Sequence, residues 1–201
     1  MSTTATPPPP TPPPPQHEHR RRASDQPGHP LHHATVAERA ALLVQRTHPA
    51  AWLWLSLAVV ALDQVTKFLV TRFLELYERV EVLPVLDFTL LHNTGAAFSI
   101  LADASGWQRG FFIGLGIVVC LVLIVWLWRL PRGERLLPIS LALIVGGAVG
   151  NVIDRVTHGY VIDFIHAHWG EAYFPAFNVA DSAITIGAAL LLLDAFREQR
   201  A

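Results

Sequence analysis

Two aspartates, Asp163 and Asp181, stand eighteen positions apart beside the last of four long apolar stretches. An ionisable side chain near membrane depth is energetically unfavourable, which makes it a candidate functional residue. If the two carboxyl groups meet, like-charge repulsion and loss of water let the pair share one proton near neutral pH. One member then acts as a base on water and the other as an acid toward an amide, as in an aspartic peptidase. Taken alone, Asp181 also fits a first-turn acid that interacts with a helix dipole.

Polar residues suited to contacting a substrate occur in three other places. Asn93 both donates and accepts hydrogen bonds and Gly95 permits close backbone approach, although this pattern also fits a tight turn. Asn151 and Arg155 are four residues apart on one predicted helix face, and arginine binds carboxylates or phosphates through paired hydrogen bonds. Asn178 lies near the start of the last apolar stretch, where it can cap a helix or bind an acid.

Three further charged residues are interpreted mainly as structural. Asp63 and Lys67 are spaced i, i+4 in the first apolar stretch, so we expect an ion pair that lowers the cost of placing both charges there. Positioning of a substrate is the alternative for this pair. Asp154 is either a brace paired with the adjacent Arg155 or a member of the site.

The composition indicates a membrane protein. The chain has 201 residues, of which 52% are hydrophobic and only 15% are charged, whereas a soluble domain carries roughly 25% charged residues. The net charge of −1 argues against a nucleic-acid binder, because no basic surplus neutralises phosphates. Each of the four apolar stretches is close to the roughly 20 residues that cross a bilayer. We therefore predict an α-helical integral membrane protein with four transmembrane helices at residues 51–71, 108–128, 137–156 and 178–196.

The segments between these helices carry their own signals. Residues 80–83 and 88–92 are typical of short strands, so the loop at 72–107 is expected to form a small sheet on the outer membrane surface. The loop at 157–177 is rich in aromatic residues that suit a membrane interface. Residues 1–50 form a proline-rich segment that we expect to be a disordered cytoplasmic tail, with a ligand for a proline-recognition domain as the alternative.

Basic residues set the expected orientation. Arg129, Arg132 and Arg135 fill the short link between the second and third predicted helices, and Arg197 and Arg200 follow the fourth. The excess of Lys and Arg on this side favours both termini in the cytoplasm, with the two longer loops and the acids outside.

Other chemistries remain open at this stage. Four histidines share the outer side with Asp163 and raise a zinc site as a rival, although no H-E-x-x-H motif is present; they are His92, His158, His166 and His168. The single cysteine, Cys120, lies in an apolar run and is interpreted as packing. A small proton-coupled transporter and an assembly scaffold are the two alternatives to an enzyme.

Taken in order, five motifs resemble the bacterial lipoprotein signal peptidases, or signal peptidase II family, over about residues 50–197. The motifs are Asp63-x-x-x-Lys67, Asn93-x-Gly95-Ala96-Ala97-Phe98, Gly150-Asn151-x-x-Asp154-Arg155, Val161-x-Asp163-Phe164 and Phe177-Asn178-x-Ala180-Asp181.

The resemblance implies a fold, an activity and a location. The fold would be four transmembrane helices with a small extracytoplasmic β-cradle, in the bacterial inner membrane. The activity would be aspartic endopeptidase cleavage of a diacylglyceryl-modified prolipoprotein just before its lipidated cysteine, with Asp163 and Asp181 as the catalytic pair. Asn93, Asn151, Arg155 and Asn178 would line the site. The family uses no metal or organic cofactor, and we expect a monomer that contacts membrane lipid and binds no nucleic acid.

Overall fold

The computed structural model describes residue 35 and residues 48–95 and 107–198. The chain divides into two compact units, residues 1–44 and 45–201, and every helix and strand below belongs to the second unit. Apart from Thr35 and residues 48–50, the predicted tail at residues 1–50 lies outside the described residues, as do Ala96, Ala97 and Phe98 of the third quoted motif.

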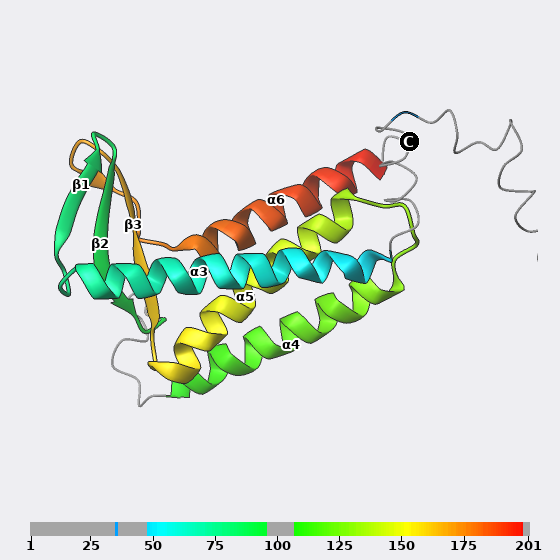
Figure 1. Cartoon of the computed structure of the whole chain (residues 1–201), viewed down its shortest axis with the longest axis horizontal. Coiled ribbons are helices and arrows are strands. Elements are labelled where there is room, and N and C mark those ends of the chain that lie inside the picture. The colour runs from blue at the N-terminus through cyan, green and yellow to red at the C-terminus, as the bar shows by residue number, and fades with distance from the viewer. Residues whose placement is uncertain (1–34, 36–47, 96–106, 199–201) are drawn as a thin grey trace, which may run out of the picture. The chain divides into compact units, whose positions relative to one another are not determined.

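Four helices are long and apolar enough to cross a membrane. They are α3 (Leu53–Phe73), α4 (Trp107–Arg129), α5 (Leu136–Thr157) and α6 (Val179–Glu198), and a short 3-10 helix, η1 (Pro49–Trp52), precedes α3. They run alongside one another in a bundle (Figure 1). The prediction of four transmembrane helices is confirmed, with each end within two residues of its predicted position.

The bundle exposes apolar side chains outward. On α4, Leu121 and Val122 are each 58% exposed, which suits a helix that faces lipid, because no water is present there to disfavour apolar surface. Helix α5 is the most buried of the four and packs against α3, α4 and α6. Three polar residues of α5, Ser140, Asn151 and Asp154, are buried and so point into protein rather than into lipid.

An antiparallel sheet stands at one end of the bundle (Figure 1). Its strand order is β1 (Arg79–Leu83), β2 (Leu86–Asn93), β3 (Val161–Trp169) and β4 (Ala172–Tyr173). The two strands predicted in the first loop are confirmed as β1 and β2. Strand β3 was not predicted: it lies in the segment expected to be a loop and pairs with β2 along most of its length.

The sheet has its own small apolar core. Leu90 of β2 and Ile162 and Phe164 of β3 are buried together with Val70 of α3. This packing fixes β3 against the end of α3. The residue between the two buried β3 side chains is Asp163, so the same packing holds that carboxylate in place.

Candidate active site

Asp163 lies on β3 and is only 3% exposed. In the β2–β3 pairing, Asp163 lies opposite Leu91 and Val161 lies opposite Asn93, so Asn93 is a diagonal neighbour on the same face of the sheet. The Nδ2 of Asn93 donates to Asp163 Oδ2 over 2.8 Å. The side-chain oxygen of Asn93 accepts from the backbone N–H of Gly95 over 2.8 Å, which leaves the NH2 group facing the acid.

Gly95 occupies a position that a larger residue would not fit. Its φ of +94° is in the left-handed region, and an added Cβ would meet the Phe112 ring at 2.5 Å. Gly95 thus forms a turn that orients Asn93, and its contact with a substrate stays a prediction.

Asp181 lies in the first turn of α6 and is bound by Asn178 in a reciprocal cap. The backbone N–H of Asp181 donates to Asn178 Oδ1 over 2.9 Å, and the backbone N–H of Asn178 donates to Asp181 Oδ2 over 3.3 Å. This is the arrangement of a capping box, which satisfies donors at a helix start. The other carboxylate oxygen, Oδ1, accepts from Asn151 Nδ2 over 2.8 Å.

Asn178 joins the two acids. While its oxygen caps α6, its Nδ2 donates to Asp163 Oδ1 over 2.8 Å. The preceding residue, Phe177, exchanges backbone hydrogen bonds with Ile165 of β3, which brings the start of α6 beside that strand. Asp163 and Asp181, from separate stretches of sequence, therefore share one fully buried asparagine.

The environment of Asp163 favours its protonated form. Burial raises the pKa of Asp163 from 3.8 to about 6; the neighbouring Asp181 also raises it, and hydrogen bonds from Asn93 and Asn178 act in the opposite direction. A carboxyl group with this pKa exchanges protons near neutral pH.

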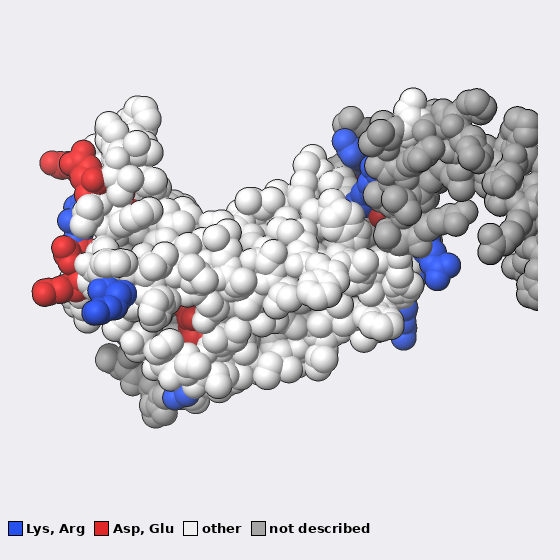
Figure 2. Space-filling view, in the orientation of Figure 1, with Lys and Arg blue, Asp and Glu red and all other residues white. Residues whose placement is uncertain are grey.

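Each of the two acids lines a cavity. A cavity of about 490 Å³ is lined by Asp181 together with apolar side chains that include Phe174, Phe177 and Ile186. A second cavity of about 290 Å³ is lined by Asp163 and by Leu91, His92, Asn93 and Thr94. Both cavities have Pro175 and Ala176 in their walls. The surface between the sheet and α6 is hollowed and uncharged on the face visible in Figure 2.

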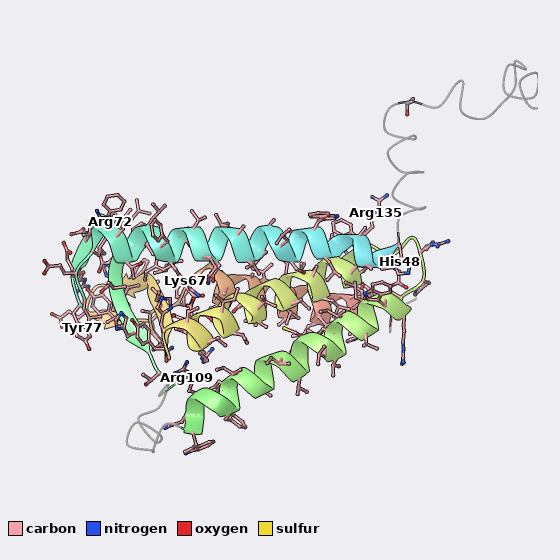
Figure 3. The ribbon with its side chains drawn as sticks, turned by 60° about the horizontal axis from the view of Figure 1, so that its bottom comes forward. His48, Lys67, Arg72, Tyr77, Arg109 and Arg135 are labelled. Atoms are coloured by element: carbon pink, nitrogen blue, oxygen red, sulfur yellow. The ribbon has the colours of Figure 1, made fainter. Side chains whose placement is uncertain are left out.

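Asp154 pairs with Lys67 rather than with Arg155. The Nζ of Lys67 lies 2.8 Å from Asp154 Oδ2 and 2.8 Å from Asp63 Oδ2. Figure 3 shows Lys67 on the side of α3 that faces α5. The expected Asp63–Lys67 pair forms. Asp154 is a structural brace, as considered, but its ion-pair partner is Lys67 across the interface with α3, because adjacent residues on a helix point in different directions.

Arg155 extends toward the site from the end of α5. Its guanidinium lies 5.0 Å from the centre of the Phe112 ring, and Nη1 donates to the Asn151 carbonyl over 3.3 Å. Asp181 and Asp163 are both within electrostatic range of this cation. The structure thus brings Arg155 together with the two acids and the three asparagines.

The four histidines considered as zinc ligands lie in two separate groups, each packed around a tyrosine. His92 and His158 flank Tyr160, with ring centres 3.8 and 5.8 Å away. His166 and His168 flank Tyr173, each at 4.8 Å. Among residues 48–95 and 107–198, no three His, Cys, Asp or Glu side chains are placed to hold a metal ion together.

Three residues of the site region were missed in the sequence. Gln64 donates to Asp63 and Asp154 and so belongs to the buried charged group around Lys67. Pro175 and Ala176 separate the two cavities. The run Phe174-Pro175-Ala176-Phe177 before Asn178 was the available signal, since a proline between aromatic residues indicates a rigid turn.

Known proteins resemble this chain over most of its length. The family model described as signal peptidase (SPase) II matches residues 55–197. The lipoprotein signal peptidase of Acinetobacter baumannii is 53% identical over 149 residues, covering 74% of this chain and 85% of the relative. Those of Pseudomonas putida and Pseudomonas syringae pv. tomato are 53% and 55% identical over 152 residues, covering 75% of this chain and 89% and 88% of the relatives.

Solved structures agree with the sequence relatives. A bacterial membrane enzyme superposes with a TM-score of 0.66 at 32% identity, covering 74% of this chain and 89% of that one. A second structure of a bacterial membrane enzyme gives a TM-score of 0.65 at 32% identity, with coverage of 72% and 92%. The family match covers nearly all of the four apolar helices and the sheet at the end of the bundle. The chain therefore belongs to the signal peptidase II family.

Proposed function

We propose that this chain removes the signal peptide from prolipoproteins as an aspartic endopeptidase, with Asp163 and Asp181 as the catalytic pair. The observation that carries the proposal is the shared asparagine. Asn178 donates its side-chain NH2 to Asp163 and its backbone N–H to Asp181, so one residue fixes the position of both acids. Peptidase activity itself follows from membership of the family.

The neutral donors around the acids support a shared proton. Asp163 accepts from two amide NH2 groups, and Asp181 accepts from an amide NH2 and a backbone N–H. None of these donors carries a charge, so they orient the carboxyl groups without fully stabilising two negative charges. We expect the pair to share one proton around pH 6, where Asp163 titrates.

Hydrolysis follows from this arrangement. The ionised carboxylate takes a proton from a water molecule while the water oxygen attacks the carbonyl carbon of the scissile amide. The protonated carboxyl donates its proton to the carbonyl oxygen, which gives a neutral tetrahedral diol. When the diol collapses, the carboxyl group that took the proton from water gives it to the departing nitrogen as the carbon–nitrogen bond breaks. A hydroxyl of the diol returns its proton to the other carboxylate, so the pair again holds one proton.

The surroundings of the pair suit a lipid-modified substrate. We propose that the substrate is a precursor whose cysteine already carries diacylglycerol, and that the cut falls just before this cysteine. The cavity beside Asp181 has a mainly apolar lining and extends along α6 to Ile186, which is 54% exposed on the outside of the bundle. A precursor whose acyl chains stay in the lipid can reach such a site from within the membrane.

The chain is a multi-pass protein of the bacterial inner membrane, given its four membrane-spanning helices and its family. We propose further that both termini are cytoplasmic and that the sheet and the acids face the extracytoplasmic side. Three exposed arginines at the opposite end of the bundle, Arg129, Arg132 and Arg135, support this orientation.

The test is cleavage of a purified diacylglyceryl-modified prolipoprotein by the full chain in detergent or lipid. Asp163→Asn and Asp181→Asn are each expected to lower kcat by about 10³- to 10⁴-fold, because an amide cannot exchange the proton. Asp194→Asn is the matched control, since it changes an acid on the same helix as Asp181 outside the site.

Two outcomes would contradict the proposal. Wild-type kcat in either Asp163→Asn or Asp181→Asn would show that these two acids are not the catalytic pair. If a precursor without diacylglycerol were cleaved as fast as the modified one, the lipid requirement would be wrong. A transporter or a scaffold would show no cleavage by the wild-type chain.

A further inference from the structure

Three buried charges lie directly behind the candidate catalytic pair. Asp63, Lys67 and Asp154 are 0%, 1% and 1% exposed, and Lys67 Nζ binds both acids at 2.8 Å. We call these three residues the buried charge triad. Buried ions are costly unless their hydrogen bonds are satisfied, and Gln64 Nε2 donates to both acids of the triad.

Each acid of the triad also reaches the backbone beside a candidate catalytic residue. Asp63 Oδ1 accepts from the backbone N–H of Ala180 over 2.9 Å, and Ala180 immediately precedes Asp181. Asp154 Oδ2 accepts from the backbone N–H of Ile162 over 3.1 Å, and Ile162 immediately precedes Asp163. The buried charge triad therefore fixes the backbone immediately before Asp163 and immediately before Asp181.

The cation of the triad determines which way Asn151 faces. Lys67 Nζ donates to Asn151 Oδ1 over 3.1 Å. An ammonium group has only donors, so it binds the oxygen of the amide and not its nitrogen. The NH2 group of Asn151 is thereby turned to Asp181 Oδ1, to which it donates over 2.8 Å.

We propose that Lys67, held by Asp63 and Asp154, is a positioning residue of the hydrolytic reaction that keeps Asn151 oriented as a donor to Asp181. This inference rests on the proposed function and adds a role outside the catalytic pair. A purely structural brace between α3 and α5 explains the two ion pairs. It does not explain why three further bonds of the triad reach Ala180, Ile162 and Asn151.

The first experiment compares turnover with substrate binding. Lys67→Met in the full chain is expected to lower kcat on a diacylglyceryl-modified prolipoprotein by about 100-fold, the effect of a displaced reacting group, with KM within about twofold of wild type. The control is Ser56→Ala on the same helix. Its hydroxyl joins α3 to α5 through Ala142 O without touching the triad, so kcat is expected to stay at the wild-type value.

A double-mutant cycle tests whether Lys67 acts through Asn151. Interacting residues give non-additive effects, whereas independent residues give effects that multiply. In an Asn151→Ala background, Lys67→Met is expected to lower kcat by less than about tenfold further. A full 100-fold loss in both backgrounds, or wild-type kcat in Lys67→Met, would overturn the inference.

If Lys67→Met does not fold, Lys67→Arg provides the same cycle, because it keeps the charge between the two acids. Its planar guanidinium cannot reproduce the three bonds of Lys67 Nζ. We therefore expect Lys67→Arg to lower kcat by at least about tenfold in the wild-type background and to have no further effect on kcat in the Asn151→Ala background. Wild-type kcat in Lys67→Arg would overturn the inference. An inactive wild-type chain or an active Asp163→Asn variant would instead overturn the proposed function.

Discussion

At the scale of single residues, the surroundings of Asp163 explain why the site is built from asparagines. A cation in direct contact with a carboxylate lowers its pKa and keeps it ionised. Asn93 and Asn178 instead orient Asp163 with neutral donors, and its pKa remains at about 6 because burial outweighs their effect. The buried cation Lys67 binds Asn151 and two other acids rather than the pair itself.

Removing one of these donors is expected to change the pH dependence of activity. The hydrogen bond from Asn93 lowers the pKa of Asp163, so Asn93→Ala raises that pKa and keeps the carboxyl protonated to higher pH. The basic limb of the kcat–pH profile is expected to move to higher pH, and kcat at the optimum to fall by about 10- to 100-fold, the worth of one hydrogen bond to a charged group. Movement of the basic limb to lower pH would contradict this assignment.

The same carboxyl group is expected to lower stability at high pH. Its folded-state pKa is raised from 3.8 to about 6, so the stability present below pH 3.8 is lost as the pH rises through 6. Asp163→Asn removes the buried charge. It is expected to raise the free energy of unfolding by about 1–3 kcal/mol at pH 8 and by less at pH 4. Thermal melting of the purified protein at both pH values measures this, and an equal difference at the two values would refute it.

At the scale of elements, glycines on α5 set how closely its neighbours approach. An added Cβ at Gly146 would lie 2.8 Å from Ser56 O of α3, and one at Gly147 would lie 2.3 Å from Ala180 O of α6. At Gly150 it would lie 2.6 Å from Asp63 Oδ2. These contacts bring α3 and α6 close enough to α5 for Lys67 and Asp181 to reach Asn151.

Gly147→Ala is expected to disturb the site through the backbone of α6. Since Ala180 O cannot rotate away, the start of α6 must move, and with it Asp181. We expect a loss of about 1–3 kcal/mol in stability and a fall in kcat of about tenfold or more. Gly114→Ala on α4 is the control, because an added Cβ there meets nothing within 4 Å of the described residues; it is expected to leave kcat unchanged. Equal kcat in the two variants would show that the close approach is not needed.

The elements that sequence predicts well are those specified locally. A helix that crosses lipid needs a long apolar run, and this run is visible in the sequence without knowledge of its neighbours. Strand β3 was missed because its apolar residues are continuous over Val161–Ile165 apart from Asp163, so the alternation of a half-buried strand is absent. Residues 157–177 were therefore interpreted as a loop.

The residues proposed for the candidate site can be chosen from the sequence, but the bonds that connect them cannot. Spacing placed Asp63 and Lys67 on one face of α3, and the ion pair follows from that. The bond from Lys67 to Asp154 depends on how α3 crosses α5, which no local pattern specifies. The placement of Asp163 and Asp181 around Asn178 likewise depends on the bridge between Ile165 and Phe177, a pairing that no local pattern specifies.

At the scale of the whole described bundle, charge is divided between two ends. Charged side chains on the visible face lie at the sheet end and at the opposite end, with a largely uncharged surface between them (Figure 2). Arg72 and Tyr77 lie at the sheet end, and His48 and Arg135 at the other (Figure 3). The sheet end carries exposed acids beside its arginines, including Glu75, Glu78 and Glu81. The exposed Arg129, Arg132 and Arg135 lie at the opposite end, which supports the proposed cytoplasmic location of that end.

This orientation can be measured with single cysteines, because Cys120 is the only cysteine of the chain and is buried. In a Cys120→Ala background, Trp169→Cys reports on the sheet end, where Trp169 is 82% exposed. Arg132→Cys reports on the exposed link between α4 and α5. A maleimide that does not cross membranes is expected to label Trp169→Cys in intact spheroplasts and Arg132→Cys only after lysis. The reverse pattern would place the candidate site in the cytoplasm, where a precursor cleaved after export could not reach it.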